Sequence, residues 1–180
     1  RIVEGEAIFE GKDLLKLSKE ELRQIRGKDI AMIFQDPMTS LNPIMKVGIQ
    51  IMETILWHRI MSDKETKDRA IELLRVVGIP EYKTRVWDYP FQFSGGVRQR
   101  VIIAIALACN PKLVIADEPT TALDVTIRAQ ILNLLSDMKE EFKTSVIFIT
   151  HDVTLAMNFA DNIMVMYAGK IAEYAPTEKF

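Results

Sequence analysis

The stretch from Phe93 to Asp124 constrains the fold of this chain more than any other. It begins with the letters FSGGVRQR, continues through the apolar run VIIAIALAC, and reaches LVIADEP and TALD. Ser94 is a good N-cap residue, and the two glycines after it have no side chain to keep a ligand away from the backbone amides. Free amides and partial positive charge at a helix N-terminus attract anions. The stretch therefore predicts an anion site at the start of a helix.

Two adjacent carboxylates follow an apolar strand. Leu113–Ala116 is a continuous apolar run, and Asp117 and Glu118 come directly after it. In a parallel α/β sheet, ligands bind at the carboxyl ends of the strands. An anion site followed by an acid pair at a strand end indicates chemistry on a nucleotide and a metal ion. Without the motifs on either side of it, an acid in the position of Glu118 is more often a solvated residue at a strand end than a catalytic one.

Three motifs in one order give the chain a resemblance to a known family. SGG-x-RQR, the apolar strand ending in DEP, and ALD resemble the signature motif, the Walker B strand and the D-loop of ATP-binding-cassette (ABC) transporters. The resemblance implies an α/β fold: a RecA-like P-loop NTPase core with a mostly parallel sheet, truncated here, and an inserted all-helical subdomain. The implied domains are residues 1–34 (remainder of the N-terminal antiparallel lobe and a core strand), 35–93 (Q-loop and helical subdomain) and 94–180 (signature helix and core with Walker B, D-loop and switch histidine).

The resemblance also implies roles for single residues, with ATP and Mg²⁺ as ligands. Asp117 would hold Mg²⁺, and Glu118 would polarise or orient the attacking water. Gln35 matches the Q-loop glutamine, which touches Mg²⁺ and the γ-phosphate, and His151 matches the switch histidine, which contacts the γ-phosphate. The residues expected to bind ATP are Ser94, Gly95, Gly96, Gln99 and Asp124.

Three of these residues also have an ordinary structural interpretation. A glutamine after a strand, as Gln35 is, is most often a surface amide. A histidine at a strand–helix junction, as His151 is, is by default a polar or capping residue. Asp124 would serve as the N-cap of the helix that follows it, and both of its roles are compatible. We read His58, in the helical region, as a surface or packing residue.

The segment Ile33–Pro43 narrows the resemblance within the family. Its letters, IFQDPMTSLNP, resemble the ATPases of oligopeptide and dipeptide importers and of their nickel- and glutathione-importing cousins. The implied function is an ATPase subunit that couples ATP binding and hydrolysis to peptide import. The alternatives are import of nickel, glutathione or another small solute, and a non-transport cassette that acts on DNA or ribosomes.

The implied partners follow from the same resemblance. They are a second ATPase subunit, identical or homologous, in a head-to-tail dimer, and transmembrane permease subunits. An extracytoplasmic solute-binding protein would act indirectly, and no nucleic acid is expected. The implied location is peripheral, on the cytoplasmic face of the cell membrane.

A P-loop of the form G-x-x-x-x-G-K-[ST] is absent from the sequence. In the nearest approach, Gly5 and Gly11 are one residue too far apart, and Asp13 stands where a hydroxyl is needed. We therefore expect a fragment of a longer ATPase that begins after the P-loop and is inactive on its own.

Composition excludes several classes of protein. The formal charge of −2 gives no electrostatic case for a nucleic-acid binder. The longest apolar runs are about half of what spans a bilayer. The single cysteine, Cys109, lies in an apolar run and is expected to pack as a small hydrophobe.

Strands and helices are expected to alternate along the chain. This pattern predicts a mostly parallel sheet covered by helices on both faces. The expected strands are Ile2–Phe9, Ile30–Phe34, Leu113–Ala116, Ser145–Ile149, Asn162–Tyr167 and Lys170–Tyr174. The expected helices are a short one between the capping residue Ser18 and Gly27, then Val47–Ile60, Lys64–Val77 with Asp63 as its cap, Thr126–Phe142 and Asp152–Phe159.

Overall fold

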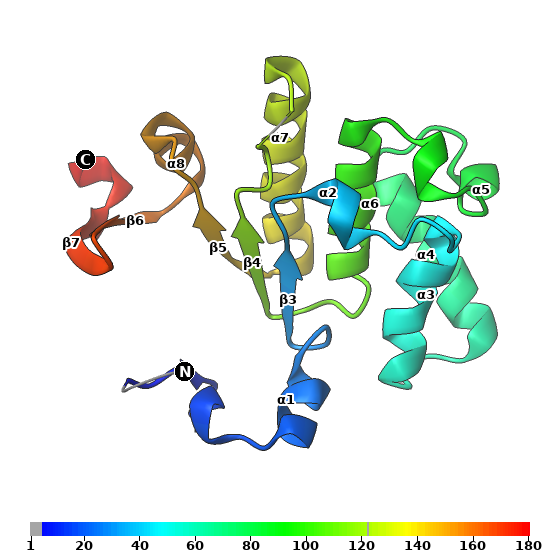
Figure 1. Ribbon diagram of the computed structural model, residues 1–180, viewed down its shortest axis with the longest axis horizontal. Helices are drawn as coiled ribbons and strands as arrows, with labels where there is room; N and C mark the ends of the chain where they lie inside the picture. The colour runs from blue at the N-terminus through cyan, green and yellow to red at the C-terminus, as the bar shows by residue number, and fades with distance from the viewer. Residues whose placement is uncertain (1–4, 122) are drawn as a thin grey trace.

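A three-stranded parallel sheet forms the centre of the protein (Figure 1). The computed structural model describes residues 5–121 and 123–180, apart from the side chains of residues 37 and 38. The strands are β3 (Ile30–Ile33), β4 (Leu113–Asp117) and β5 (Ser145–Ile149), in the order β3-β4-β5. Ile33 pairs with Ala116 and Ala116 with Phe148, so the three strands end almost level with one another. The predicted parallel α/β core is therefore confirmed.

Two long helices cover one face of this sheet. They are α6 (Gly95–Ala106) and α7 (Val125–Phe142); in Figure 1, α7 lies behind the strands and α6 to the right of β3. Residues of both helices and of the sheet form one buried core, which includes Ile103, Val114 and Ile131. The burial of these apolar side chains fixes the N-terminus of α6 relative to the strand ends.

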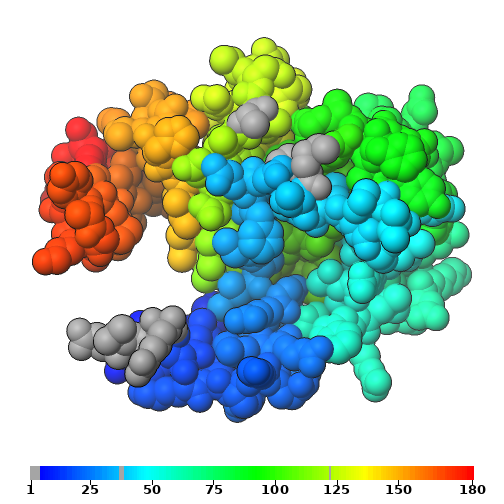
Figure 2. All heavy atoms as spheres, viewed as in Figure 1, coloured from blue at the N-terminus to red at the C-terminus, as the bar shows by residue number. Residues whose placement is uncertain are grey.

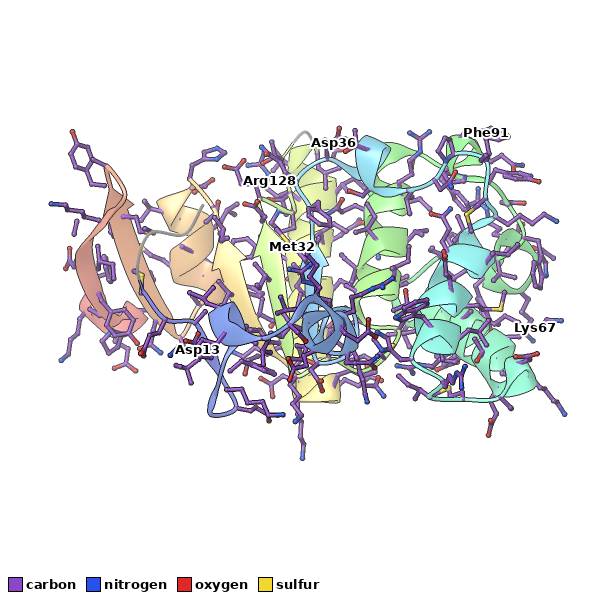
Figure 3. All side chains as sticks on the ribbon, turned by 60° about the horizontal axis from the view of Figure 1, so that its bottom comes forward. Asp13, Met32, Asp36, Lys67, Phe91 and Arg128 are labelled. Atoms are coloured by element: carbon purple, nitrogen blue, oxygen red, sulfur yellow. The ribbon has the colours of Figure 1, made fainter. Side chains whose placement is uncertain are left out.

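In its described part, the segment between β3 and α6 consists of helices joined by loops, without a strand. It contains α2 (Pro37–Ser40), α3 (Val47–Trp57), α4 (Asp63–Val76), α5 (Tyr82–Arg85) and the 3₁₀ turn η2 (Pro90–Gln92). These helices lie to one side of the sheet, where Phe91 and Lys67 are labelled in Figure 3. The cap predicted for α4 was wrong: the N-cap is Ser62, which forms a capping box with Glu65, and Asp63 is the first helical residue. Cys109 is partly buried beside α3, with its Sγ 3.7 Å from the carbonyl oxygen of Thr54, and burial raises its pKa to about 11.

Both ends of the described chain add antiparallel pairs. At the N-terminal end, β1 (Ile8–Phe9) pairs with β2 (Lys12–Asp13), and the first part of the expected strand lies outside the described residues. After η1 (Leu14–Lys16), α1 (Lys19–Ile25) begins with the predicted capping box. At the other end, α8 (Val153–Phe159) leads into β6 (Asn162–Tyr167), which pairs with β7 (Lys170–Pro176) before η3 (Thr177–Lys179). The β6–β7 pair forms its own sheet, separate from the parallel strands.

The second face of the parallel sheet is not covered by a helix in the described part of the chain. Met32, Ile147 and Ile149 lie on this face and are 40%, 49% and 45% exposed. Figure 2 shows the side chains of all three strands at the surface, and Figure 3 labels Met32 on β3. The prediction that helices cover both faces was therefore wrong for this chain. A continuous apolar run indicates that both faces of a strand are to be buried, but not which segment buries them.

Candidate functional site

Polar residues follow directly after the ends of all three parallel strands. Gln35 stands two residues after β3, Glu118 one residue after β4, and His151 two residues after β5. The level register of the strands brings these three positions to the same edge of the sheet. Asp36, labelled in Figure 3, continues the chain away from this edge into α2.

The Glu118 carboxylate is the centre of the resulting cluster. Gln35 Nε2 donates to Glu118 Oε2 at 2.9 Å, and His151 Nδ1 lies 3.0 Å from Glu118 Oε1. A third neighbour, Thr121, donates its hydroxyl to Glu118 Oε2 at 2.9 Å. The structure therefore brings together three of the predicted residues and adds Thr121, to which the sequence analysis gave no role. The signal was available, since Thr121 opens the TALD letters three residues after Glu118.

The backbone of Glu118 is held in an uncommon conformation. Its φ angle is +44°, in the left-handed region that residues with a side chain rarely adopt. Two backbone hydrogen bonds hold it there: Glu118 N–H donates to the Ile149 carbonyl at 3.0 Å, and Thr121 N–H donates to the Glu118 carbonyl at 3.1 Å. Such conformations persist where the surrounding structure fixes them. The strand therefore ends abruptly at Asp117, and the chain turns at Glu118.

The hydrogen bonds also keep Glu118 ionised. The contact with His151 is the largest cause that lowers the pKa of Glu118, followed by the hydroxyl of Thr121, and both outweigh the opposing effect of burial. A carboxylate at a strand end that is ionised and surrounded by donors can accept a hydrogen bond from a water molecule and orient it. The side chain of His151 itself is 75% exposed, so its ring is accessible from solvent.

Asp117 is the last residue of the same strand, β4, and its side chain lies on one face of the sheet. It pairs with Ile149 in the register and alternates with Ala116, which places it on the uncovered face of the sheet. Among the described residues, no group of three His, Cys, Asp or Glu side chains is arranged to hold a metal ion. Mg²⁺ takes only one or two protein carboxylates and completes its shell with waters and phosphate oxygens. The half-buried carboxylate of Asp117 fits this pattern of binding.

The N-terminus of α6 is open to solvent. Ser94 is the N-cap residue and is exposed, but its side chain makes no capping hydrogen bond, contrary to the prediction from its residue type. A Cβ atom added at Gly95 would meet nothing within 4 Å. A Cβ atom at Gly96 would lie 2.7 Å from Cγ2 of Ile127 on α7. The two glycines thus have different roles: Gly95 leaves the helix end accessible, and Gly96 permits the close approach of α6 to α7.

The remaining two predicted ATP contacts differ in accessibility. Asp124 is exposed and caps α7, where its Oδ1 accepts a hydrogen bond from Ile127 N–H at 2.9 Å. Gln99 is only 1% exposed, and its Nε2 has no hydrogen-bond partner among the described residues. The side chain of Gln99 is therefore enclosed by the protein, and its expected contact with a nucleotide has no support in this structure. It lies on the second turn of α6, on the face that packs into the core.

Within residues 5–121 and 123–180, no helix combines the length and the apolar character needed to cross a bilayer.

Comparison with known proteins gives close relatives over nearly the whole chain. The oligopeptide transport ATP-binding protein OppD of Bacillus subtilis is 61% identical over 169 residues, which cover 94% of this chain and 47% of that protein. OppD of Haemophilus influenzae is 54% identical and covers 98% of this chain and 55% of that protein. The dipeptide transport ATP-binding protein DppD of Lactococcus lactis is 52% identical over 179 residues, which are 51% of that protein. The chain spans about half the length of these curated relatives.

Solved structures agree with these sequence relationships. The ATP-binding cassette MJ0796, solved as a dimer in a post-hydrolysis state bound to ADP and Pi, matches with a TM-score of 0.84 and 32% identity. The match covers 97% of this chain and 74% of that one. The protein cbiO1 from Clostridium perfringens, part of the ABC transporter complex cbiONQ, matches with a TM-score of 0.81 and 27% identity over 96% of this chain and 66% of that one. A family description, ABC transporter, matches residues 1–121. On these grounds, the chain belongs to the ABC transporter family.

Proposed function

We propose that the protein containing this chain is the ATPase subunit of a peptide importer. The observation that carries the proposal is the convergence of Gln35 and His151 on the carboxylate of Glu118, at the carboxyl ends of three parallel strands. The names of the relatives, oligopeptide and dipeptide transport ATP-binding proteins, supply the solute class.

In the proposed mechanism, Glu118 orients the water that attacks the γ-phosphate of ATP. The left-handed turn at Glu118 aims its carboxylate at the strand-end edge, and the donors around it fix its orientation. Phosphoryl transfer needs this kind of positioning more than covalent help. His151 and Gln35 stand beside the same carboxylate and would contact the phosphate.

Asp117 would hold Mg²⁺, which supplies positive charge that offsets the charge developing on the phosphate oxygens. The open N-terminus of α6, with Ser94 and Gly95 exposed, would bind the phosphates of an ATP held by a second subunit in a head-to-tail dimer. Transmembrane permease subunits would complete the transporter, with this subunit on the cytoplasmic face of the membrane.

The decisive experiment uses the full-length protein encoded by the native gene. Glu118→Gln keeps the shape of the side chain but removes its negative charge, and we expect ATP hydrolysis to fall by about 100-fold or more. Dimer formation in the presence of ATP should be retained. Glu140→Gln, an exposed change on α7, is the matched control and should hydrolyse ATP normally. Normal hydrolysis by Glu118→Gln would contradict the assignment.

A transport assay tests the solute separately. Cells that lack the gene should lose uptake of a labelled tripeptide, and the wild-type gene, but not Glu118→Gln, should restore it. Loss of nickel or glutathione uptake, with peptide uptake intact, would overturn peptide import while leaving the ATPase assignment in place.

A further inference from the structure

Thr121 contacts Glu118 through two separate hydrogen bonds. Its backbone N–H donates to the Glu118 carbonyl at 3.1 Å, and its hydroxyl donates to Glu118 Oε2 at 2.9 Å. Both bonds close a local turn of four residues, so they form without help from any other strand. Thr121 is thus joined to both the backbone and the side chain of the same residue.

The other two neighbours of the carboxylate are held less firmly. Gln35 is exposed, and its contact with Glu118 joins positions 83 residues apart. His151 is 75% exposed. Water competes for donors in such positions, and hydrogen bonds at exposed sites add little net stability. Thr121, by contrast, is half-buried and follows two buried residues, Pro119 and Thr120. A ligand that drew Gln35 and His151 away would leave Thr121 as the remaining donor to the carboxylate.

We propose that Thr121 is a positioning residue that holds Glu118 Oε2 and thereby leaves Oε1 to accept the hydrogen bond of the attacking water. A hydroxyl has one hydrogen to donate, and here that hydrogen is directed at Oε2. Oε1 faces His151, whose movement would open it to water. This inference rests on the proposed role of Glu118 in ATP hydrolysis.

The shape of threonine suits this role and suggests the variants. Two heavy atoms on Cβ restrict χ1, which limits the directions that the hydroxyl can take. Thr121→Val keeps the shape but removes the donor, whereas Thr121→Ser keeps the donor and loses only the methyl group. A purely structural threonine would depend on shape and packing, and would tolerate valine at least as well as serine.

The kinetic test compares these variants in the full-length protein. We expect Thr121→Val to lower kcat for ATP hydrolysis by about 10- to 100-fold, because a small displacement of a reacting group is costly. The KM for ATP should stay within about twofold, because in this proposal Thr121 acts through Glu118 and not on the nucleotide. Thr121→Ser should keep most of the activity, and the exposed control Thr126→Val on α7 all of it. In a Glu118→Gln background, Thr121→Val should have no further effect.

A second readout needs neither nucleotide nor turnover. NMR scalar couplings of the Glu118 side chain should report one dominant rotamer in the wild type and in Thr121→Ser, and averaging among rotamers in Thr121→Val. Thr121→Ala also removes the hydroxyl and repeats the comparison if the valine variant unfolds. Equal activity of valine and wild type, equal impairment of serine and valine, or an unchanged rotamer in valine would each overturn the proposal. If the wild type does not hydrolyse ATP, the proposed function fails, and the rotamer comparison alone decides whether Thr121 holds the carboxylate.

Discussion

The Nε2 atom of Gln35 lies 2.9 Å from Oε2 of Glu118 and joins two positions that are 83 residues apart in the chain. Gln35 stands where β3 leaves the sheet for the helical segment, and Glu118 stands where β4 ends. A shift of the helical segment that moves Gln35 therefore changes the hydrogen bonds of the Glu118 carboxylate. This contact links the candidate catalytic group to the part of the molecule that begins with α2.

We expect Gln35→Ala to lower the rate of ATP hydrolysis by the full-length protein about tenfold or more, because the protein loses the amide that is proposed to contact the phosphate from beside Glu118. Steady-state assays with saturating ATP measure the effect. Gln24→Ala is the matched control, since Gln24 is an exposed amide on α1 that bonds only to Glu20 among its described contacts. Unchanged hydrolysis by Gln35→Ala would show that the 2.9 Å contact has no part in the reaction.

The two glycines after Ser94 should respond differently to alanine. At Gly96 the new Cβ would meet a branch carbon of Ile127 at 2.7 Å, and overpacking of this kind costs about 1–3 kcal/mol. At Gly95 nothing lies within 4 Å, so Gly95→Ala should leave stability unchanged or raise it by about 0.5–1 kcal/mol, as expected for alanine in a helix. Urea unfolding measures both variants. Adding Ile127→Ala to Gly96→Ala should recover part of the loss, and equal stability of the two single variants would contradict the packing argument.

The capping box of α4 predicts a loss of stability that depends on pH. Ser62→Ala should cost about 1 kcal/mol at neutral pH, whereas Asp63→Asn, one residue later, should cost far less. The Ser62 hydroxyl and backbone N–H lower the pKa of Glu65 below its ordinary value. The pKa of Glu65 is lower in the folded protein than in the unfolded chain. The stability that its contacts with Ser62 contribute is therefore fully present above the unfolded pKa and is lost as the pH falls through the folded pKa. Denaturant unfolding at pH 7 and pH 3 should therefore show a smaller difference between wild type and Ser62→Ala at pH 3.

Several elements were predictable because their signals are local. The boundaries of β5, Ser145–Ile149, follow from an apolar run between polar residues, and the capping box at Ser18 follows from S-x-x-E. The same S-x-x-E pattern runs from Ser62 to Glu65, so the N-cap of α4 was also readable from the sequence; Asp63, itself a good capping residue, was chosen instead.

The candidate site was predictable to a lesser extent. Residue type and strand-end position suggested Gln35 and His151, and the family resemblance gave them roles. The burial of Gln99 could not be predicted, because it depends on which face of α6 packs into the core. The spacing of Thr121 three residues after Glu118 was visible in the sequence, but the contact itself depends on the left-handed turn at Glu118, which no glycine marks.

The uncovered face of the parallel sheet predicts that the 180-residue chain associates with itself. Met32, Ile147 and Ile149 expose apolar surface on this face, and within the described residues the outer edge of β5 is unpaired. Exposed apolar patches and free strand edges both favour association between chains. Sedimentation velocity should show oligomers whose share rises with protein concentration.

Ile147→Lys should reduce the share of oligomers, because a charged side chain on this face opposes contact between two copies. Ile44→Lys is the matched control: Ile44 is 82% exposed but lies in the loop before α3, away from the sheet, so its replacement should leave association unchanged. A monomer at every concentration, or an equal effect of the two lysine variants, would show that the open face does not drive the association.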